Sequence, residues 1–164
     1  MIETKVEHAG ATAVLEKVAQ AVTNRAPLMR SIAGIMTDAV EENFAQEGRP
    51  KWAGLKNPGP RRSGGKILQD SGRLAASITG GSDNDSAVVG TNVKYAAIHQ
   101  FGGQTRAHLI KPKNKKALAF GGKVVKQVNH PGSKIPARPF LLLTDSDCNE
   151  IEQTAEDYLR RVTG

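Results

Sequence analysis

The stretch Pro27–Phe44, "PLMRSIAGIMTDAVEENF", carries the clearest periodic pattern in the sequence. Its apolar residues recur at steps of three and four positions, and the charged residues lie off that stripe. This spacing predicts an amphipathic helix of about 18 residues. Pro27 suits the first turn of a helix, and Gly48 with Pro50 is expected to end it. The apolar stripe comprises Leu28, Ile32, Ile35, Met36, Ala39, Val40 and Phe44.

Weaker patterns on both sides of this helix predict further elements. Residues 2–7 alternate apolar and polar side chains, as a half-buried strand does, and residues 11–23 have apolar positions at helical spacing. A strand at 77–82, a turn rich in acidic residues and asparagine, and the run "AVVGTN" at 87–92 predict an antiparallel hairpin. The final stretch, 141–162, predicts a closing helix with a possible break at Asp145–Asp147.

Residues 48–66 are expected to form an extended basic loop. They hold five glycines and three prolines without periodicity, and Trp52 and Leu55 are their only plausible contacts with a core. Directly after the loop, Asp70 or Ser71 could cap a short helix that runs through Leu74.

A second hairpin is predicted within residues 103–135 by "ALAF", a Gly-Gly turn and "KVVKQV". Four prolines in and after this stretch favour an arm that protrudes from the main sheet. Its lysines are suited to salt-sensitive phosphate contacts without base readout, but they could equally keep an exposed hairpin soluble and block edge pairing. These lysines are Lys111, Lys113, Lys115, Lys116, Lys123 and Lys126.

Length and composition predict a single domain that spans residues 1–164. Hydrophobic residues make up 38% and aromatic residues 4%, so the core is expected to be thin and oligomerisation stays open. The single Cys148 excludes an internal disulfide and a zinc site built on several thiolates. No apolar run is long enough for a membrane span and no signal peptide is evident, so we expect a soluble, unexported chain without a membrane partner.

Charge is distributed unevenly along a chain whose net charge is +7. Residues 1–48 hold seven acids and four bases, and residues 49–85 hold three acids and seven bases. Residues 86–144 hold ten bases and no acid, whereas residues 145–164 hold six acids and two bases. This pattern fits either an ordinary dipolar surface or a ring in which an acidic face of one copy meets a basic face of the next.

The sequence lacks the usual constellations of an enzyme or a metal centre. His8, His99, His108 and His130 form no pair at i and i+4, and no carboxylate lies between residues 86 and 144. A G-x-S-x-G motif is missing, and "RRSGGK" lacks the spacing of a phosphate-binding loop. We therefore expect no catalytic residue, no metal and no cofactor, and an enzyme is the weakest hypothesis.

Four sequence blocks in order resemble a known family. They are "FAQEGRPKWAGL", "ILQDSGRLAASI", "VVGTNVKYAAIHQFGG" and "IPARPFLLL", with the hairpin "KPKNKKALAF" before the last. From about Phe44 to Leu143 the chain resembles the virion morphogenesis or tail-completion proteins of tailed bacteriophages, the group that includes those of phages Mu and P2.

The resemblance implies an α+β fold, with an antiparallel sheet flanked by helices and a protruding basic hairpin, that assembles into rings, often hexameric. It also implies a structural protein of the phage neck, located in the virion after assembly in the host cytoplasm. Such a protein completes the tail and joins it to the head, and its partners are its own copies, the tail tube protein and head-connector proteins. A head-side adaptor ring and a stand-alone, non-specific nucleic-acid-binding module are the alternatives, and contact with packaged DNA stays open.

In such a ring we expect the predicted arm to reach a neighbouring subunit or to line the lumen, where its lysines would meet acidic protein surface or DNA. The resemblance further assigns roles to residues around the arm. Tyr95, Ile98, His99 and Phe101 are expected on a short helix that packs against the sheet, and Gly102 and Gly103 release the chain into the arm. Arg138, Pro139 and Phe140 are expected to hold the returning chain: proline fixes an extended path, Phe140 fills an apolar slot, and Arg138 donates to a carboxylate or to backbone carbonyls.

Overall fold

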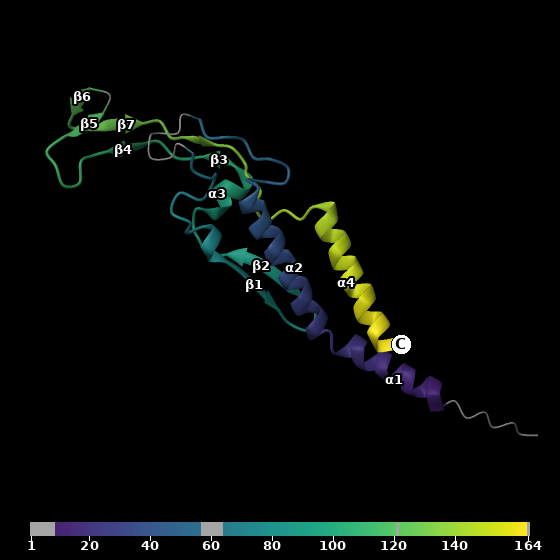
Figure 1. Cartoon of the computed structure of the whole chain (residues 1–164). Coiled ribbons are helices and arrows are strands. Elements are labelled where there is room, and N and C mark those ends of the chain that lie inside the picture. The colour runs from purple at the N-terminus through teal and green to yellow at the C-terminus, as the bar shows by residue number, and fades with distance from the viewer. Residues whose placement is uncertain (1–8, 57–63, 121, 164) are drawn as a thin grey trace, which may run out of the picture.

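The computed structural model describes residues 9–56, 64–120 and 122–163. The molecule is elongated, with helix α2 (Ala26–Ala45) along its middle (Figure 1). A β-hairpin lies on one side of α2 and helix α4 (Asp145–Thr163) on the other, while helix α1 (Ala9–Thr23) extends beyond α4 at one end. The strand predicted at residues 2–7 lies outside the described residues.

Helix α2 is confirmed as the central element. Ala39, Val40 and Phe44 of the predicted stripe are buried, and Pro27 lies in the first turn. Ala33 and Asn43, which are not on that stripe, are buried as well. The chain leaves the helix through Gly48, which has a φ of 102° and donates its backbone N–H to the carbonyl of Asn43 at 2.7 Å. A glycine favours this left-handed geometry because it has no Cβ.

The predicted hairpin is present as β1 (Ile78–Ser82) and β2 (Ala87–Thr91), paired antiparallel. Both strands pack against α2. Gly80 permits close approach of the strand to the helix, because a Cβ there would lie 2.5 Å from the Oγ1 of Thr37. The hairpin therefore covers one side of α2 through a glycine contact as well as through apolar side chains.

Helix α4 begins at Asp145, four residues later than the sequence pattern suggested, and runs through to Thr163. The hydroxyl of Thr144 accepts from the backbone N–H of Asp147 at 3.4 Å, and the carboxylate of Asp147 accepts from the backbone N–H of Thr144 at 2.7 Å. This reciprocal pair is a capping box, which fixes the first turn of a helix. The predicted break at Asp145–Asp147 is wrong because these residues form that first turn.

The apolar stripe of α1 is only partly covered. Ala21 is buried, and the hydroxyl of Tyr158 on α4 donates to the carbonyl of Asn24 at 2.9 Å. Leu15, however, is 68% exposed, and Val14 and Val22 are also exposed. Among the described residues, no helix combines the length and apolar character needed to cross a membrane.

The α+β class is confirmed, but the expected single sheet is wrong. The described strands form four separate two-stranded antiparallel sheets, because each strand is only two to five residues long and pairs with one neighbour. Where a short helix through Leu74 was expected, a single 3₁₀ turn occupies Ala75–Ser77. The other three strand pairs are β3 (Gly103–Gln104) with β8 (Lys134–Ile135), β4 (His108–Ile110) with β7 (Val128–His130), and β5 (Leu118–Phe120) with β6 (Lys123–Val125).

The core is small and aromatic. The ring of Phe44 lies 5.4 Å from that of Phe140 and 5.8 Å from that of Trp52, in an edge-on arrangement with the latter. Trp52 is buried, as expected, and Leu55 packs against the same cluster. The remaining buried members of this cluster are Val40, Ile67, Leu74 and Ala96.

Candidate functional site: segment 103–135 and its anchor

Segment 103–135 extends from the end of the molecule opposite α1 (Figure 1). Its two ends lie side by side: the backbone N–H of Thr105 donates to the carbonyl of Ser133 at 2.9 Å, and that of Ser133 donates to the hydroxyl of Thr105 at 2.7 Å. Beyond this point β4 pairs with β7, and the predicted hairpin β5–β6 forms the tip. The segment therefore leaves and rejoins the body at one place.

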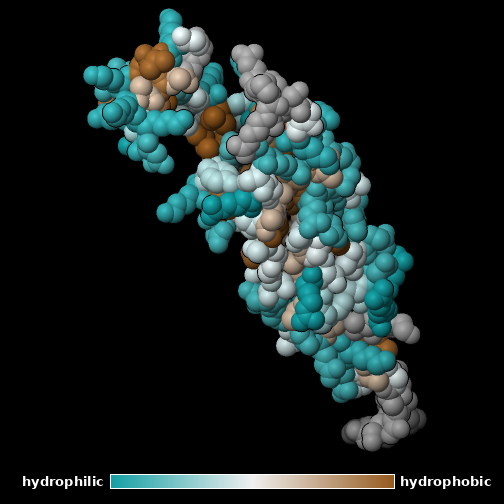
Figure 2. Space-filling model, turned by 60° about the vertical axis from the view of Figure 1, so that its left-hand side comes forward, coloured by the Kyte–Doolittle hydropathy of each residue, from teal (hydrophilic) through white to brown (hydrophobic). Residues whose placement is uncertain are grey.

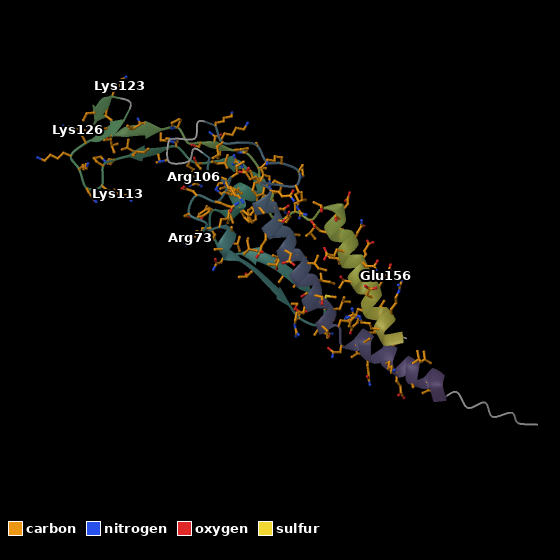
Figure 3. All side chains as sticks on the ribbon, viewed as in Figure 1. Arg73, Arg106, Lys113, Lys123, Lys126 and Glu156 are labelled. Atoms are coloured by element: carbon orange, nitrogen blue, oxygen red, sulfur yellow. The ribbon has the colours of Figure 1, made fainter. Side chains whose placement is uncertain are left out.

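The lysines of segment 103–135 are exposed. Lys113, Lys123 and Lys126 lie at the end of the molecule remote from Glu156 of α4 (Figure 3). Within the described parts of the chain, the ion pairs do not include any lysine of this segment. The other exposed lysines are Lys111, Lys115, Lys116 and Lys134.

Segment 103–135 has no core of its own. Among its residues whose burial is described, none is buried. Leu109 is 42% exposed and Val124 is 72% exposed. Figure 2 shows hydrophobic side chains gathered at this end of the molecule, between hydrophilic ones. Exposed apolar side chains interspersed with cations are suited to contact with another macromolecule.

Two aligned histidines mark the stem of the segment. His108 and His130 are direct partners across β4 and β7, and their rings stack with centroids 5.1 Å apart. The Nδ1 of His130 accepts from the backbone N–H of Gly132 at 3.0 Å. The described residues contain no group of three or more histidine, cysteine or acidic side chains that could hold a metal ion.

The two glycines at the base of the segment adopt backbone angles that favour glycine. Gly102 has a φ of 73°, and a Cβ there would lie 2.8 Å from the backbone nitrogen of Ala137. Gly103 has a φ of 157°. Together they turn the chain out of helix α3 (Ala96–Phe101) and into β3.

Helix α3 places its aromatic residues differently from expectation. Ala96 is buried, and Tyr95 makes an edge-on ring contact with His99 at 5.9 Å. Phe101 does not pack against the sheet and is 79% exposed. Phe101 follows Ala96 by five residues and therefore lies about 140° around the helix axis from it. Because Ala96 faces the core, Phe101 faces outward.

The return segment, residues 136–142, holds the base of segment 103–135 against the body. Arg138 is buried, and its guanidinium donates to the carbonyls of Ala53 at 3.0 Å and Gly54 at 3.3 Å. The backbone N–H of Arg138 donates to the carbonyl of His99 at 2.7 Å. The carbonyl of Pro139 accepts from the indole N–H of Trp52 at 3.4 Å, and Phe140 is fully buried.

Sequence patterns missed the polar network that fixes this return segment. Asn43 is fully buried in α2 and donates to the carbonyls of Phe140 at 3.0 Å and Leu142 at 2.7 Å. Its side-chain oxygen accepts from the Nε of Arg49 at 2.9 Å. Arg49 also pairs in a bidentate manner with Asp147, at 3.1 and 2.9 Å. The Thr-x-x-Asp pattern at Thr144 and Asp147 is typical of a capping box, and it could have predicted the position of Asp147 at the start of α4.

A second polar contact ties α3 to the return segment. The side-chain oxygen of Gln100 accepts from the backbone N–H groups of Phe140 and Leu141, each at 3.0 Å. Gln100 thus provides a hydrogen-bond acceptor for two backbone N–H groups that are not paired within a strand. Because buried backbone N–H groups need partners, this contact helps to fix the position of Phe140.

The Asp147 carboxyl remains charged for a structural reason. Burial opposes its ionisation, but hydrogen bonds from the backbone of Thr144 and from Arg49 outweigh that effect, so the pKa of Asp147 is lowered. The charged carboxylate thereby links the N-terminal cap of α4 to Arg49, four residues after the end of α2. This arrangement is stabilising rather than catalytic.

His99 lines a cavity of about 220 Å³ together with Asp70, Ser71, Tyr95 and Arg138. Burial, and secondly the positive charge of Arg138, lower the pKa of His99. Its Nδ1 is buried and has no hydrogen-bond partner among the described residues. A histidine that serves as a general base is usually oriented by an acid, and the Nδ1 of His99 has no such partner among the described residues.

Two comparisons with known proteins match most of this chain. A model of the phage virion morphogenesis family matches residues 6–160. The chain belongs to this family. It is also 44% identical over 161 residues to the Mu-like prophage FluMu G protein 2 of Haemophilus influenzae, which covers 98% of this chain and 97% of that protein. No solved structure matches.

The phage virion morphogenesis family is a family of structural and assembly proteins. The matched residues include α1, α2, segment 103–135 and most of α4, so the match is not limited to the compact body. The predicted resemblance is thereby confirmed.

Proposed function

We propose that this protein completes the tail of a bacteriophage as a homo-oligomeric ring and joins the tail to the head connector. Its partners would be further copies of itself, the tail tube protein and head-connector proteins. In this proposal segment 103–135 is a basic arm that reaches beyond its own subunit. The exposed cations and apolar side chains of that segment, set apart from the small core, are the observation that carries the proposal.

The separation of charge supports a ring in particular. Lys113, Lys123 and Lys126 lie far from Glu156 in the same chain (Figure 3), so these lysines cannot pair with Glu156 of their own subunit. Copies arranged head to tail could bring them together, and a head-to-tail contact that closes on itself makes a ring. Such a ring would need no catalytic residue.

Electron microscopy of particles from a phage with a nonsense mutation in this gene tests the proposal. We expect tails of abnormal length or tails that fail to join heads, with full restoration when the wild-type gene is supplied from a plasmid. Normal tails with empty or leaking heads would instead place the protein on the head side of the junction. Normal infectious particles would exclude a role in virion assembly.

A further inference from the structure

We propose that segment 103–135 of one copy docks on the acidic outer face of α4 of a second copy. This inference rests on the proposed function, since it specifies the contact that would join neighbouring subunits. The surface it names is centred on Glu152 and Glu156 and includes Leu159. The three positions fall at i, i+4 and i+7 and therefore share one face of the helix.

Charge complementarity selects this pair of surfaces. Segment 103–135 contains eight lysine or arginine residues and no acid, whereas α4 contains six acids and two bases. Glu152 and Glu156 are exposed, and the ion pair of Glu156 in the described part of the chain is with Arg160 of its own helix, at 3.6 Å. The basic segment therefore meets an acidic surface whose own ion pair is weak and open to solvent.

Apolar side chains occur on both surfaces as well. Val124 and Leu109 of the segment are exposed, and Leu159 on α4 is 48% exposed. Ile151 and Ala155 lie about 100° around the helix from Glu152 and Glu156 and are partly covered where α4 packs on α2 and α1. Leu159 is one turn after Ala155, so it lies at the border between the covered face and the acidic face. A mixed lysine and valine surface on a mixed glutamate and leucine surface would bury apolar area and pair charges in one contact.

The contact cannot form within one chain. The labelled lysines and Glu156 lie on opposite sides of the elongated molecule (Figure 3), and the ends of the segment are fixed at Thr105 and Ser133. A second copy is therefore the partner that supplies the acidic face. DNA would use the same lysines but would leave the exposed acids of α4 without a role.

Reciprocal charge reversal tests this docking. The first variant carries Lys113→Glu, Lys115→Glu and Lys116→Glu, and the second carries Glu152→Lys and Glu156→Lys. Each is supplied from a plasmid to the nonsense-mutant phage, and plaque titre is measured. Each variant alone presents like charges across the contact, so we expect a fall in titre of about 100-fold or more.

Co-expression of the two variants gives the decisive result. Copies that alternate around a ring would set the introduced glutamates of one variant against the introduced lysines of the other, and the unchanged lysines against the unchanged glutamates, so titre should recover at least partly. A control variant with Lys66→Glu and Lys94→Glu, both exposed and outside the segment, should complement like the wild type. Melting curves of all variants should coincide with that of the wild type, since the changed side chains are exposed.

Two outcomes would overturn the docking. If the α4 variant complements fully by itself, that face is not used. If the segment variant fails and co-expression does not rescue it, the segment binds another partner, and loss of DNA retention by the purified protein would identify that partner as nucleic acid. A nonsense phage with normal titre would instead contradict the proposed function itself.

Discussion

The return segment and segment 103–135 are neighbours along the chain but differ in how they are held. Phe140 is fully buried beside the ring of Phe44, and the adjoining backbone is fixed by Asn43 and Gln100. In segment 103–135, by contrast, strands of two or three residues pair without any buried side chain among those described. The first region supplies stability, and the second presents a surface.

This difference shows how a short chain with a thin core can support a large excursion. The network of Asn43, Arg49 and Asp147 joins the end of α2, the return segment and the start of α4. Because the network meets the chain where segment 103–135 rejoins the body, the segment can vary in sequence and contacts without loosening the core. Changes in the two regions should therefore separate stability from assembly.

The largest effect on stability is expected from Phe140→Ala. Removing a fully buried ring beside Phe44 leaves a cavity and should lower the free energy of unfolding by about 3–5 kcal/mol. Urea denaturation followed by circular dichroism measures this change. A loss below about 1 kcal/mol would mean that the return segment is not part of the stabilising core.

A somewhat smaller loss is expected from Asp147→Ala. This change leaves the guanidinium of Arg49 without its carboxylate and removes half of the capping box of α4. We expect the free energy of unfolding to fall by about 3 kcal/mol. Asp145→Ala is the matched control in the same turn, because Asp145 is exposed, and it should cost less than about 1 kcal/mol. Equal losses in both variants would show that the ion pair with Arg49 contributes little.

The pH dependence of stability should report His99. Its folded pKa is lowered from the ordinary value of 6.5, so the unfolded chain binds a proton more readily, and stability should decline as the pH falls below 6.5. Asp147 also has a lowered pKa, but its contribution should be lost only below its ordinary value of 3.8. Melting temperatures across pH 3–8 should show both declines, and His99→Gln should remove the upper one alone. An unchanged upper decline in His99→Gln would assign it to another group.

The smallest effect on stability is expected from Phe101→Ala, although the same residue type is removed as in Phe140→Ala. Phe101 is 79% exposed, so the free energy of unfolding should change by less than about 0.5 kcal/mol. Exposed aromatic residues often carry binding energy at interfaces, so complementation of the nonsense phage should nevertheless be impaired. Full complementation together with a large loss of stability would show that Phe101 contributes to stability and not to assembly.

The sequence was sufficient to predict elements defined by local patterns. The stripe of α2 and the turns of the two hairpins are local signals, and each predicted the element that the structure contains. The burial of Trp52 was predicted from an apolar residue set among glycines and prolines, whereas the burial of Phe140 was an expectation from the family resemblance.

The remaining features depend on contacts between distant parts of the chain. Asn43 reaches the carbonyls of Phe140 and Leu142, almost a hundred positions away, and no local pattern specifies those partners. The outward direction of Phe101 depends on which face of α3 meets the core, which a helix of six residues does not reveal by its spacing. The separate two-stranded sheets likewise follow from how the strands are placed, not from their individual propensities.

The central claim is that the body supplies stability and segment 103–135 supplies assembly. It is tested most directly by replacing residues 106–132 with Asn-Gly, a two-residue turn suited to closing Thr105 onto Ser133, which already exchange hydrogen bonds. The measurement is the plaque titre of the nonsense phage complemented by this closed variant, whose unfolding free energy should stay within about 1 kcal/mol of the wild type. The account predicts a folded protein and no rescue of titre. A folded variant that restores titre would contradict it.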